Sequence, residues 1–276
     1  MRAHGEAPVR APWSGARKRA VAPAVILAID IGNTSISLAA FDGDRLVADD
    51  RLPVDDAEWI SHTWRSSRLA RAGAIEAVLL SSVRPAAEPP IVAWASVDLR
   101  TPLQRPRIDF PIPLGAKVAS PDEVGVDRLL ASYAAHRRAR GAAIAITFGT
   151  AITVNAVSAS GDFLGGAIGP GVGLSAEALS RETAFLPRVE PVAQERVIGT
   201  DTPSAIRSAL YHGFGGMVAH LVAGVSAEMG GSPAVFGTGG DAVLLSPHLP
   251  GMVVVPHLVA EGLVRAWLAS QGRPLK

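Results

Sequence analysis

The chain has no cysteine and few aromatic residues, and these absences exclude several kinds of protein before any motif is considered. Of its 276 residues, none is Cys and only 5% are Phe, Trp or Tyr. Without Cys there is no disulfide, no thiolate nucleophile and no Cys-ligated zinc, and the composition is compatible with a reducing compartment. No apolar run reaches the roughly 18–20 residues of a membrane-spanning helix. We therefore expect a soluble, cytoplasmic protein with no membrane partner.

Net charge is also nearly absent, because 26 basic residues stand against 25 acidic ones and leave +1. This balance gives no reason to expect a nucleic-acid partner. The first 23 residues differ in kind: five basic residues against Glu6 alone give them a net charge of +4, and they contain three prolines. We predict that 1–23 is a disordered extension. A basic arm that touches nucleic acid or a membrane is the alternative.

One pattern of three strands and two turns occurs twice. The apolar run 25–29 ends in Asp30-Ile31-Gly32-Asn33-Thr34, and strands at 35–41 and 45–52 follow. The run 143–146 ends in Thr147-Phe148-Gly149-Thr150-Ala151, and strands at 152–157 and 163–166 follow. Asp30 matches Thr147, Gly32 matches Gly149 and Asn33 matches Thr150. Two such turns facing each other predict a clamp around a polyanion, and therefore a phosphate-handling enzyme of two similar halves.

The remaining segments alternate between apolar strands and helical periods, and this order predicts an α/β protein with a mixed sheet in each half. A helix is predicted from Pro121, with Ser120 as its N-cap and Glu123 completing a capping box. A long helix is predicted over 203–229, with a glycine-rich middle. We divide the chain into the extension 1–23 and two domains, 24–125 and 126–276.

The first turn has the residue types of a phosphate site. Gly32 and Asn33 tolerate left-handed backbone conformations, and successive amide groups in such a turn can cradle phosphate oxygens. Asp30, at the end of a strand, can hold Mg²⁺ through water. An ordinary Asn-containing hairpin would look the same in isolation, and the second copy favours the phosphate interpretation. No Walker motif is present, and a strand follows each turn, which argues against a dinucleotide fold.

Two further segments carry candidate site residues. In Gly125-Val126-Asp127-Arg128, Asp127 can act as a general base for an alcohol and Arg128 can bind a carboxylate. The alternative is an Asp stabilised by the helix dipole beside a surface Arg. Gly239, in a glycine-rich turn after a strand, can let the backbone approach a planar base, or can simply form a strand-to-helix turn. The histidines have no metal-ligand spacing.

With these residues in view, the chain resembles the type III pantothenate kinases, members of the actin/hexokinase/Hsp70-like ATPase superfamily. The resemblance runs from about Val25 to Leu268. Several motifs in one order carry it: Asp30 to Thr34, Pro121 to Arg128, Phe148 to Thr153, Gly165 to Gly171, Thr183 to Pro187, and Thr238-Gly239-Gly240.

The resemblance implies a duplicated ribonuclease H-like fold, a homodimer, and ATP-dependent phosphorylation of pantothenate, the first step of coenzyme A synthesis. It implies that ATP and Mg²⁺ meet the first turn and that Asp127 is the base. The residues implied to bind ATP are Asp30, Ile31, Gly32, Asn33, Thr34, Thr150 and Gly239. Those implied to bind pantothenate are Gly125, Val126, Asp127, Arg128 and Thr183.

Three positions depart from the family pattern. Thr147 stands where an Asp usually holds a monovalent cation (K⁺ or NH₄⁺), Asn155 stands where a second acid is usual, and Val118 replaces a Tyr. A neutral hydroxyl ligates potassium weakly, so we expect little potassium dependence. These departures leave two alternatives open: a weakened or non-catalytic regulatory homologue, and a same-fold kinase for another small hydroxylated substrate.

Overall fold

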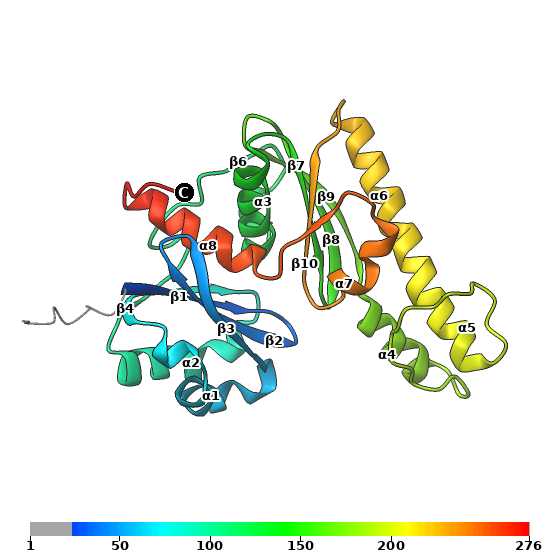
Figure 1. Cartoon of the computed structure of the whole chain (residues 1–276), viewed down its shortest axis with the longest axis horizontal. Coiled ribbons are helices and arrows are strands. Elements are labelled where there is room, and N and C mark those ends of the chain that lie inside the picture. Colours follow the sequence, from blue (N-terminus) through cyan, green and yellow to red (C-terminus); the bar gives the residue numbers. More distant parts are fainter. Residues whose placement is uncertain (1–23, 276) are drawn as a thin grey trace, which may run out of the picture.

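Two mixed β-sheets form the framework of the computed structural model, which describes residues 24–275 (Figure 1). The predicted extension 1–23 lies outside the described residues. The first sheet contains β1 (Ala24–Ile31), β2 (Ser35–Asp42), β3 (Arg45–Pro53), β4 (Ala74–Ser82) and β5 (Leu103–Gln104). The second contains β6 (Gly115–Ala116), β7 (Ala143–Phe148), β8 (Ala151–Val157), β9 (Asp162–Pro170), β10 (Ala234–Thr238) and β11 (Val253–Val254).

The two sheets repeat one topology. The first has the strand order β3-β2-β1-β4-β5, and the second has the matching order β9-β8-β7-β10-β11, with β6 added beside β9. In each, the first three strands are antiparallel neighbours and the next strand joins in parallel. The predicted α/β fold of two similar halves, of the ribonuclease H-like kind, is confirmed. The boundary at 125/126 stays a prediction, and β6 already pairs with the second sheet before it.

Eight α-helices and several shorter helical turns are described between 24 and 275. The α-helices are α1 (Ile60–Ser66), α2 (Glu88–Trp94), α3 (Val126–Ala139), α4 (Val172–Glu182), α5 (Thr202–Ser208), α6 (Phe214–Glu228), α7 (Ala242–Leu245) and α8 (Leu258–Ser270). Short 3₁₀ turns lie at Val54–Trp59, Leu69–Arg71, Pro85–Ala87, Pro121–Glu123 and Ser246–His248, and π-helical segments at Ala95–Leu99 and Ala209–Gly213.

The helices and sheets stack in five layers. One core lies between the first sheet and α1 and α2, and another between the second sheet and α4 to α7. A third, central core joins the two sheets through α3 and α8, which lie between them (Figure 1). Residues facing this centre are small where the helices cross, and a Cβ added at Gly262 of α8 would lie 2.0 Å from the Leu130 carbonyl oxygen of α3.

Strand alternation decides which residues face the centre. Ile26 and Ala28 of β1 belong to the central core, whereas Leu27 and Ile29 belong to the outer one. Because side chains alternate with a period of two, Asp30 continues the central face. Ala143 and Ala145 of β7 likewise belong to the central core, and Thr147 continues that face. The ends of both first strands therefore present their polar residue to the space between the sheets.

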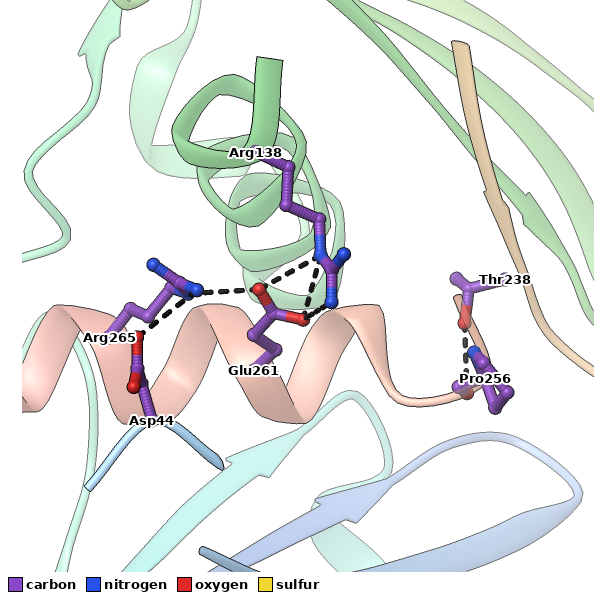
Figure 2. Close-up of polar contacts among 6 residues, drawn as sticks. All are labelled: Asp44, Arg138, Thr238, Pro256, Glu261 and Arg265. Atoms are coloured by element: carbon purple, nitrogen blue, oxygen red, sulfur yellow. Dashed lines mark hydrogen bonds and ion pairs between the residues drawn. The ribbon is translucent and has the colours of Figure 1, made fainter. Parts of the chain in front are cut away.

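A buried ionic network ties the two halves together through α8 (Figure 2). Glu261 is only 5% exposed and accepts hydrogen bonds from Arg138 of α3, from Nη2 at 2.7 Å and from Nε at 2.9 Å. The Nε atom of Arg265 donates to the same carboxylate at 2.9 Å, and its Nη2 lies 3.2 Å from Asp44 in the β2–β3 turn. Because removing one partner would leave a buried charge uncompensated, the network fixes how the halves sit.

One local prediction was wrong. Ser120 makes no capping hydrogen bond; residues 121–123 form a 3₁₀ turn, and α3 begins at Val126 with Gly125 as N-cap. The predicted long helix over 203–229 is confirmed as a continuous helical run over 202–228: α5, capped by the Asp201 side chain, continues through the π-helical segment Ala209–Gly213 into α6. At Ser120 the residue types of a cap were present without the capping hydrogen bond, whereas at Asp201 the local cap does form and the helix starts where it was expected. Among residues 24–275, no helix has the length and apolar character to cross a membrane.

Candidate active site

A cleft of about 530 Å³ opens between the two halves. Its walls come from the turns β1–β2 and β7–β8, from β3, from the N-terminus of α3 and from the segment leading into α8. Of the predicted site residues, those that line it are Asp30, Gly32, Asn33, Thr34, Asp127, Thr147, Thr150 and Gly239. The predicted arrangement of two turns facing one space is therefore present.

The first turn is braced from outside the cleft. Arg84, just after β4, donates from Nη1 to the Asn33 carbonyl oxygen at 2.7 Å and from Nη2 to Asp55 at 2.9 Å. The Val54 N–H donates to the Thr34 carbonyl at 3.1 Å. Gly32 and Asn33 do not use the left-handed conformations that their residue types tolerate, since neither has a positive φ. The four residues between the paired Ile31 and Ile36 can reverse the chain with right-handed conformations alone.

The second turn is one residue shorter than the first, with three residues between the paired Phe148 and Ile152. The Gly171 N–H donates to the Thr150 carbonyl at 2.8 Å and holds it. Gly239 comes close from the neighbouring strand: its φ is +105°, and an added Cβ would lie 2.3 Å from the Phe148 carbonyl oxygen. Only glycine fits that position without strain, which explains the glycine-rich turn after β10.

Asp30 lines the cleft and has a pKa of about 7, and burial is the largest of several causes that set this value. The nearby charge of Asp127 raises the pKa further, whereas the Ser81 hydroxyl and Arg51 act to lower it. A cation bound next to this carboxyl group would favour its charged form and would therefore lower its pKa.

Asp127 occupies the first turn of α3, and burial raises its pKa as well. The backbone N–H groups of Asp127 and Arg128 and the Arg128 charge act in the opposite direction. Gly125 leaves room for the Asp127 side chain, because an added Cβ would lie 2.7 Å from an Asp127 carboxylate oxygen and the carboxylate would have to move. The start of α3 therefore presents a partly desolvated carboxylate to the cleft, a state suited to accepting a proton.

Arg128 lies beside the cleft rather than in its lining. Its Nε donates to the Asn155 Oδ1 atom at 2.8 Å, and its guanidinium lies over the Phe163 ring, 5.4 Å from the centroid. Asn155 is fully buried, and its Nδ2 donates to the Thr153 hydroxyl at 2.9 Å, which fixes the amide orientation. Among residues 24–275, no hydrogen bond or ion pair involves the terminal nitrogens Nη1 and Nη2 of Arg128.

Several predicted residues lie away from the cleft lining. Ile31 is fully buried in the outer core of the first half, and Gly125 and Val126 flank Asp127 without lining the space. Thr183 follows α4, is exposed, and donates to the Leu179 carbonyl at 2.6 Å. The structure does not bring Thr183 to the other site residues within one subunit.

Some cleft residues were not predicted from the sequence. Arg51 and Asp49 come from β3, Thr238 from the end of β10, and His257 from the start of α8. His257 Nε2 lies 3.3 Å from an Asp49 carboxylate oxygen, across the cleft. Thr238 donates to the Pro256 carbonyl at 3.0 Å (Figure 2). Strand register could have identified Arg51, whereas His257 is brought in only by tertiary packing.

The residues at the cleft fit magnesium held through water better than a metal held directly by protein. No group of three or more His, Cys, Asp or Glu side chains in 24–275 is placed to hold an ion alone. The charge of Asp127 nevertheless helps to raise the pKa of Asp30. Hard carboxylate oxygens with space for water and phosphate ligands are what Mg²⁺ prefers in kinases.

Comparisons with known proteins were made with this geometry in view. The family model described as type III pantothenate kinase matches residues 26–224. A type III pantothenate kinase from Roseiflexus castenholzii is 36% identical over 246 residues, which covers 87% of this chain and 96% of that protein. Among solved structures, a Baf-family protein from Campylobacter jejuni has a TM-score of 0.58 at 17% identity, covering 89% of this chain and 99% of that one. The ethanolamine utilization protein EutJ from Carboxydothermus hydrogenoformans has a TM-score of 0.51 at 15% identity, covering 90% and 93%.

Proposed function

This chain belongs to the type III pantothenate kinase family, and we propose that the cleft between its halves is where ATP and pantothenate react. The protein phosphorylates pantothenate to 4′-phosphopantothenate, the first step of coenzyme A biosynthesis. The pantothenate hydroxyl oxygen bonds to the γ-phosphorus of ATP, the bond from that phosphorus to the bridging oxygen breaks, ADP leaves, and the hydroxyl proton passes to a base. Neither the regulatory alternative nor the different-substrate alternative gains support from the comparisons.

The meeting of the two turns is the observation that carries the proposed site. Thr34 and Thr150, one from each turn, both line the cleft, and the Thr150 hydroxyl donates to the Thr34 hydroxyl oxygen at 3.3 Å. Phosphoryl transfer depends mainly on positioning and on neutralising charge. We assign Asp30, Ile31, Gly32, Asn33, Thr34, Thr150 and Gly239 to ATP, with Ile31 contributing through its backbone because its side chain is buried.

Asp127 is proposed as the general base. It is a half-buried carboxylate of the cleft, and its raised pKa strengthens it as a proton acceptor for the attacking hydroxyl. Arg128, held by Asn155 beside it, is proposed to bind the pantothenate carboxylate through its free terminal nitrogens. Gly125 and Val126 complete the substrate side of the site.

Mg²⁺ would be held by Asp30 through water, and when bound it neutralises charge on the ATP phosphates. A monovalent cation is proposed to have little part in the reaction. Thr147 supplies only a hydroxyl at its expected position. Asp162, the acid of the β8–β9 turn, is outside the cleft and engaged by Lys117 at 2.8 Å.

A homodimer is proposed because the outer face of the second half is poorly covered. Of the residues in α6, only Gly215 and Val218 are buried, while Phe214, Met217, Leu221, Val222 and Val225 are partly buried. Gly215 packs against His248 of the same subunit, but Gly213 and Gly216 have open space beside them. A second copy on this face could bring Thr183 to a neighbouring site, and light scattering at micromolar concentration measures the mass.

We propose a cytoplasmic location, where ATP is available to the enzyme. The direct test of the proposed function is product analysis. Purified protein is given Mg-ATP with pantothenate, and separately with hexoses and N-acetylmannosamine, under varied K⁺ and NH₄⁺. We expect ADP and phosphopantothenate in equal amounts by mass spectrometry, with no comparable ADP release from the sugars. ADP release with a sugar but not with pantothenate would overturn the proposal.

A further inference from the structure

A row of four paired residues crosses the first sheet at the edge of the cleft. Asp30 of β1 pairs with Ser37 of β2 and with Ser81 of β4, and Ser37 pairs in turn with Arg51 of β3. Residues directly opposite each other on neighbouring strands point to the same face of a sheet. Arg51 is therefore placed on the same face as Asp30, two strands away, which is roughly 10 Å at the usual strand spacing.

The matching row of the second sheet has no charge. There Thr147 pairs with Thr153 and Thr238, and Thr153 pairs with Ile168. Ile168 thus occupies the position of Arg51, and Thr147 that of Asp30. The duplication kept hydroxyl groups along the row in both halves but placed an acid and a base in the first half alone. Of the two rows, we therefore attribute phosphate and metal binding by charged side chains to the row of the first sheet.

Arg51 is the one Arg or Lys side chain among the residues that line the cleft, in the described part of the chain. Four carboxylates line the same space: Asp30, Asp49, Asp50 and Asp127. A cleft with this balance repels a polyanion unless cations offset it. Bound magnesium supplies part of that charge, and the guanidinium of Arg51 is the available protein source.

The guanidinium is held in place yet keeps its outer nitrogens available. Its Nε donates to the Ser35 hydroxyl at 2.9 Å, at the end of the first turn. The Nη1 atom extends toward the turn after β10 of the second half, where it lies 4.0 Å from the position that a Cβ on Gly240 would take. Within 24–275 Arg51 makes no ion pair, although its charge acts on Asp30. A guanidinium that is anchored through Nε and has free Nη donors can bind one phosphate through two hydrogen bonds.

We propose that Arg51 is a further catalytic residue, whose terminal nitrogens bind the terminal phosphate of ATP and stabilise the charge that develops during transfer. This inference rests on the proposed function, because it takes ATP as the phosphoryl donor. Ser35 is the positioning residue that orients the guanidinium toward the space between the two turns. A purely structural Arg51 would only fasten β3 to the start of β2.

The test compares R51Q and R51K with R45Q, a matched control on the same strand. Arg45 is exposed outside the cleft and pairs with Asp42 at 3.0 Å, so R45Q removes an equal charge from β3. We expect R51Q to lower kcat by about 100-fold or more, R51K to recover part of it, and R45Q to match the wild type. S35A should fall between R51K and the wild type.

A second readout separates catalysis from structure. Calorimetry measures the binding of Mg-ADP and of a non-hydrolysable ATP analogue to each variant. We expect R51Q to weaken the analogue by roughly tenfold while leaving ADP within about twofold, because only the analogue has the terminal phosphate. Equal weakening of both ligands, or a normal kcat in R51Q, would overturn the proposal. Because binding is measured without pantothenate, a failure of the proposed substrate would be distinguished from a failure of this inference.

Discussion

The Oγ1 atoms of Thr34 and Thr150 lie 3.3 Å apart, although 116 positions separate the two residues in the chain. Each belongs to the turn after the first strand of its half, so this contact joins the two halves at the site where we place the ATP phosphates. The contact also shows that the duplicated turns are close enough to bind one ligand together. It forms because both first strands point their ends into the space between the sheets.

We predict that T34V and T150V each raise the KM for Mg-ATP by about fivefold to tenfold, because each removes a hydroxyl from the nucleotide site. The double variant should lose less than the product of the two single effects, since the hydroxyls share one contact. A double-mutant cycle is obtained from the steady-state kinetics of the two single variants and the double variant. T101V is the control, because Thr101 lies outside the cleft. Fully multiplicative effects would show that the two turns act independently.

Ionisation of Asp30 should make the ligand-free protein less stable as pH rises. Its pKa is about 7 in the folded chain and 3.8 ordinarily, so the folded state holds the proton more tightly and stability is lost between about pH 4 and pH 7. D30N, which cannot ionise, should therefore be more stable than the wild type at pH 8 by up to about 4 kcal/mol, with the difference vanishing near pH 4.

Urea unfolding at pH 4.5 and pH 8 measures this difference. D56N is the matched control, because Asp56 is an exposed acid outside the cleft. If D30N and D56N change the urea midpoint at pH 8 by the same amount, burial does not raise the pKa of Asp30 in the way described.

Asn155 should act on pantothenate through Arg128. N155A frees the guanidinium, and we predict a rise of about tenfold in the KM for pantothenate with the KM for ATP little changed. The matched readout is pantothenol, which lacks the carboxylate: the preference of the wild type for pantothenate over pantothenol should shrink in N155A. Circular dichroism checks the fold, because the lost hydrogen bonds are buried. An unchanged preference would mean that Arg128 does not bind the carboxylate.

Potassium should have little effect on the rate. With Thr147 in place of an acid, we expect kcat to change by less than about twofold between zero and saturating KCl. T147D should gain potassium activation, because it restores a full negative charge at the position. Steep activation of the wild type would contradict the assignment, and its loss in D162N would move the cation site to the β8–β9 turn.

Much of this site could be predicted from sequence because its main parts are local. Alternating apolar residues predict the strands before and after each turn. The turn residues occur at matching offsets in the two copies of the pattern. Asp30 and Thr147 face the centre because their strands alternate with a period of two. The repeat of this pattern predicted two halves and one shared space.

The parts that were missed depend on contacts between distant segments. Arg51 reaches the cleft only through the pairing of β3 with β2, and His257 only because α8 crosses between the sheets. The start of α3 was misplaced because Ser120 and Glu123 have the residue types of a cap, while packing against α8 favours a later start at Val126. The negative φ of Gly32 and Asn33 shows that residue type permits a left-handed turn without requiring one.

The central claim is that Asp127 removes the proton from the pantothenate hydroxyl, and single-turnover phosphorylation measures it most directly. Each protein (wild type, D127N or the control D56N) is mixed with pantothenate and Mg-ATP, with the protein in excess over pantothenate. Phosphopantothenate is then quantified over time. We predict that D127N lowers the rate by about 100-fold or more, as expected for the loss of a general base, while D56N keeps the wild-type rate. A D127N rate equal to that of the wild type would contradict the account, as would the absence of phosphopantothenate from the wild type itself.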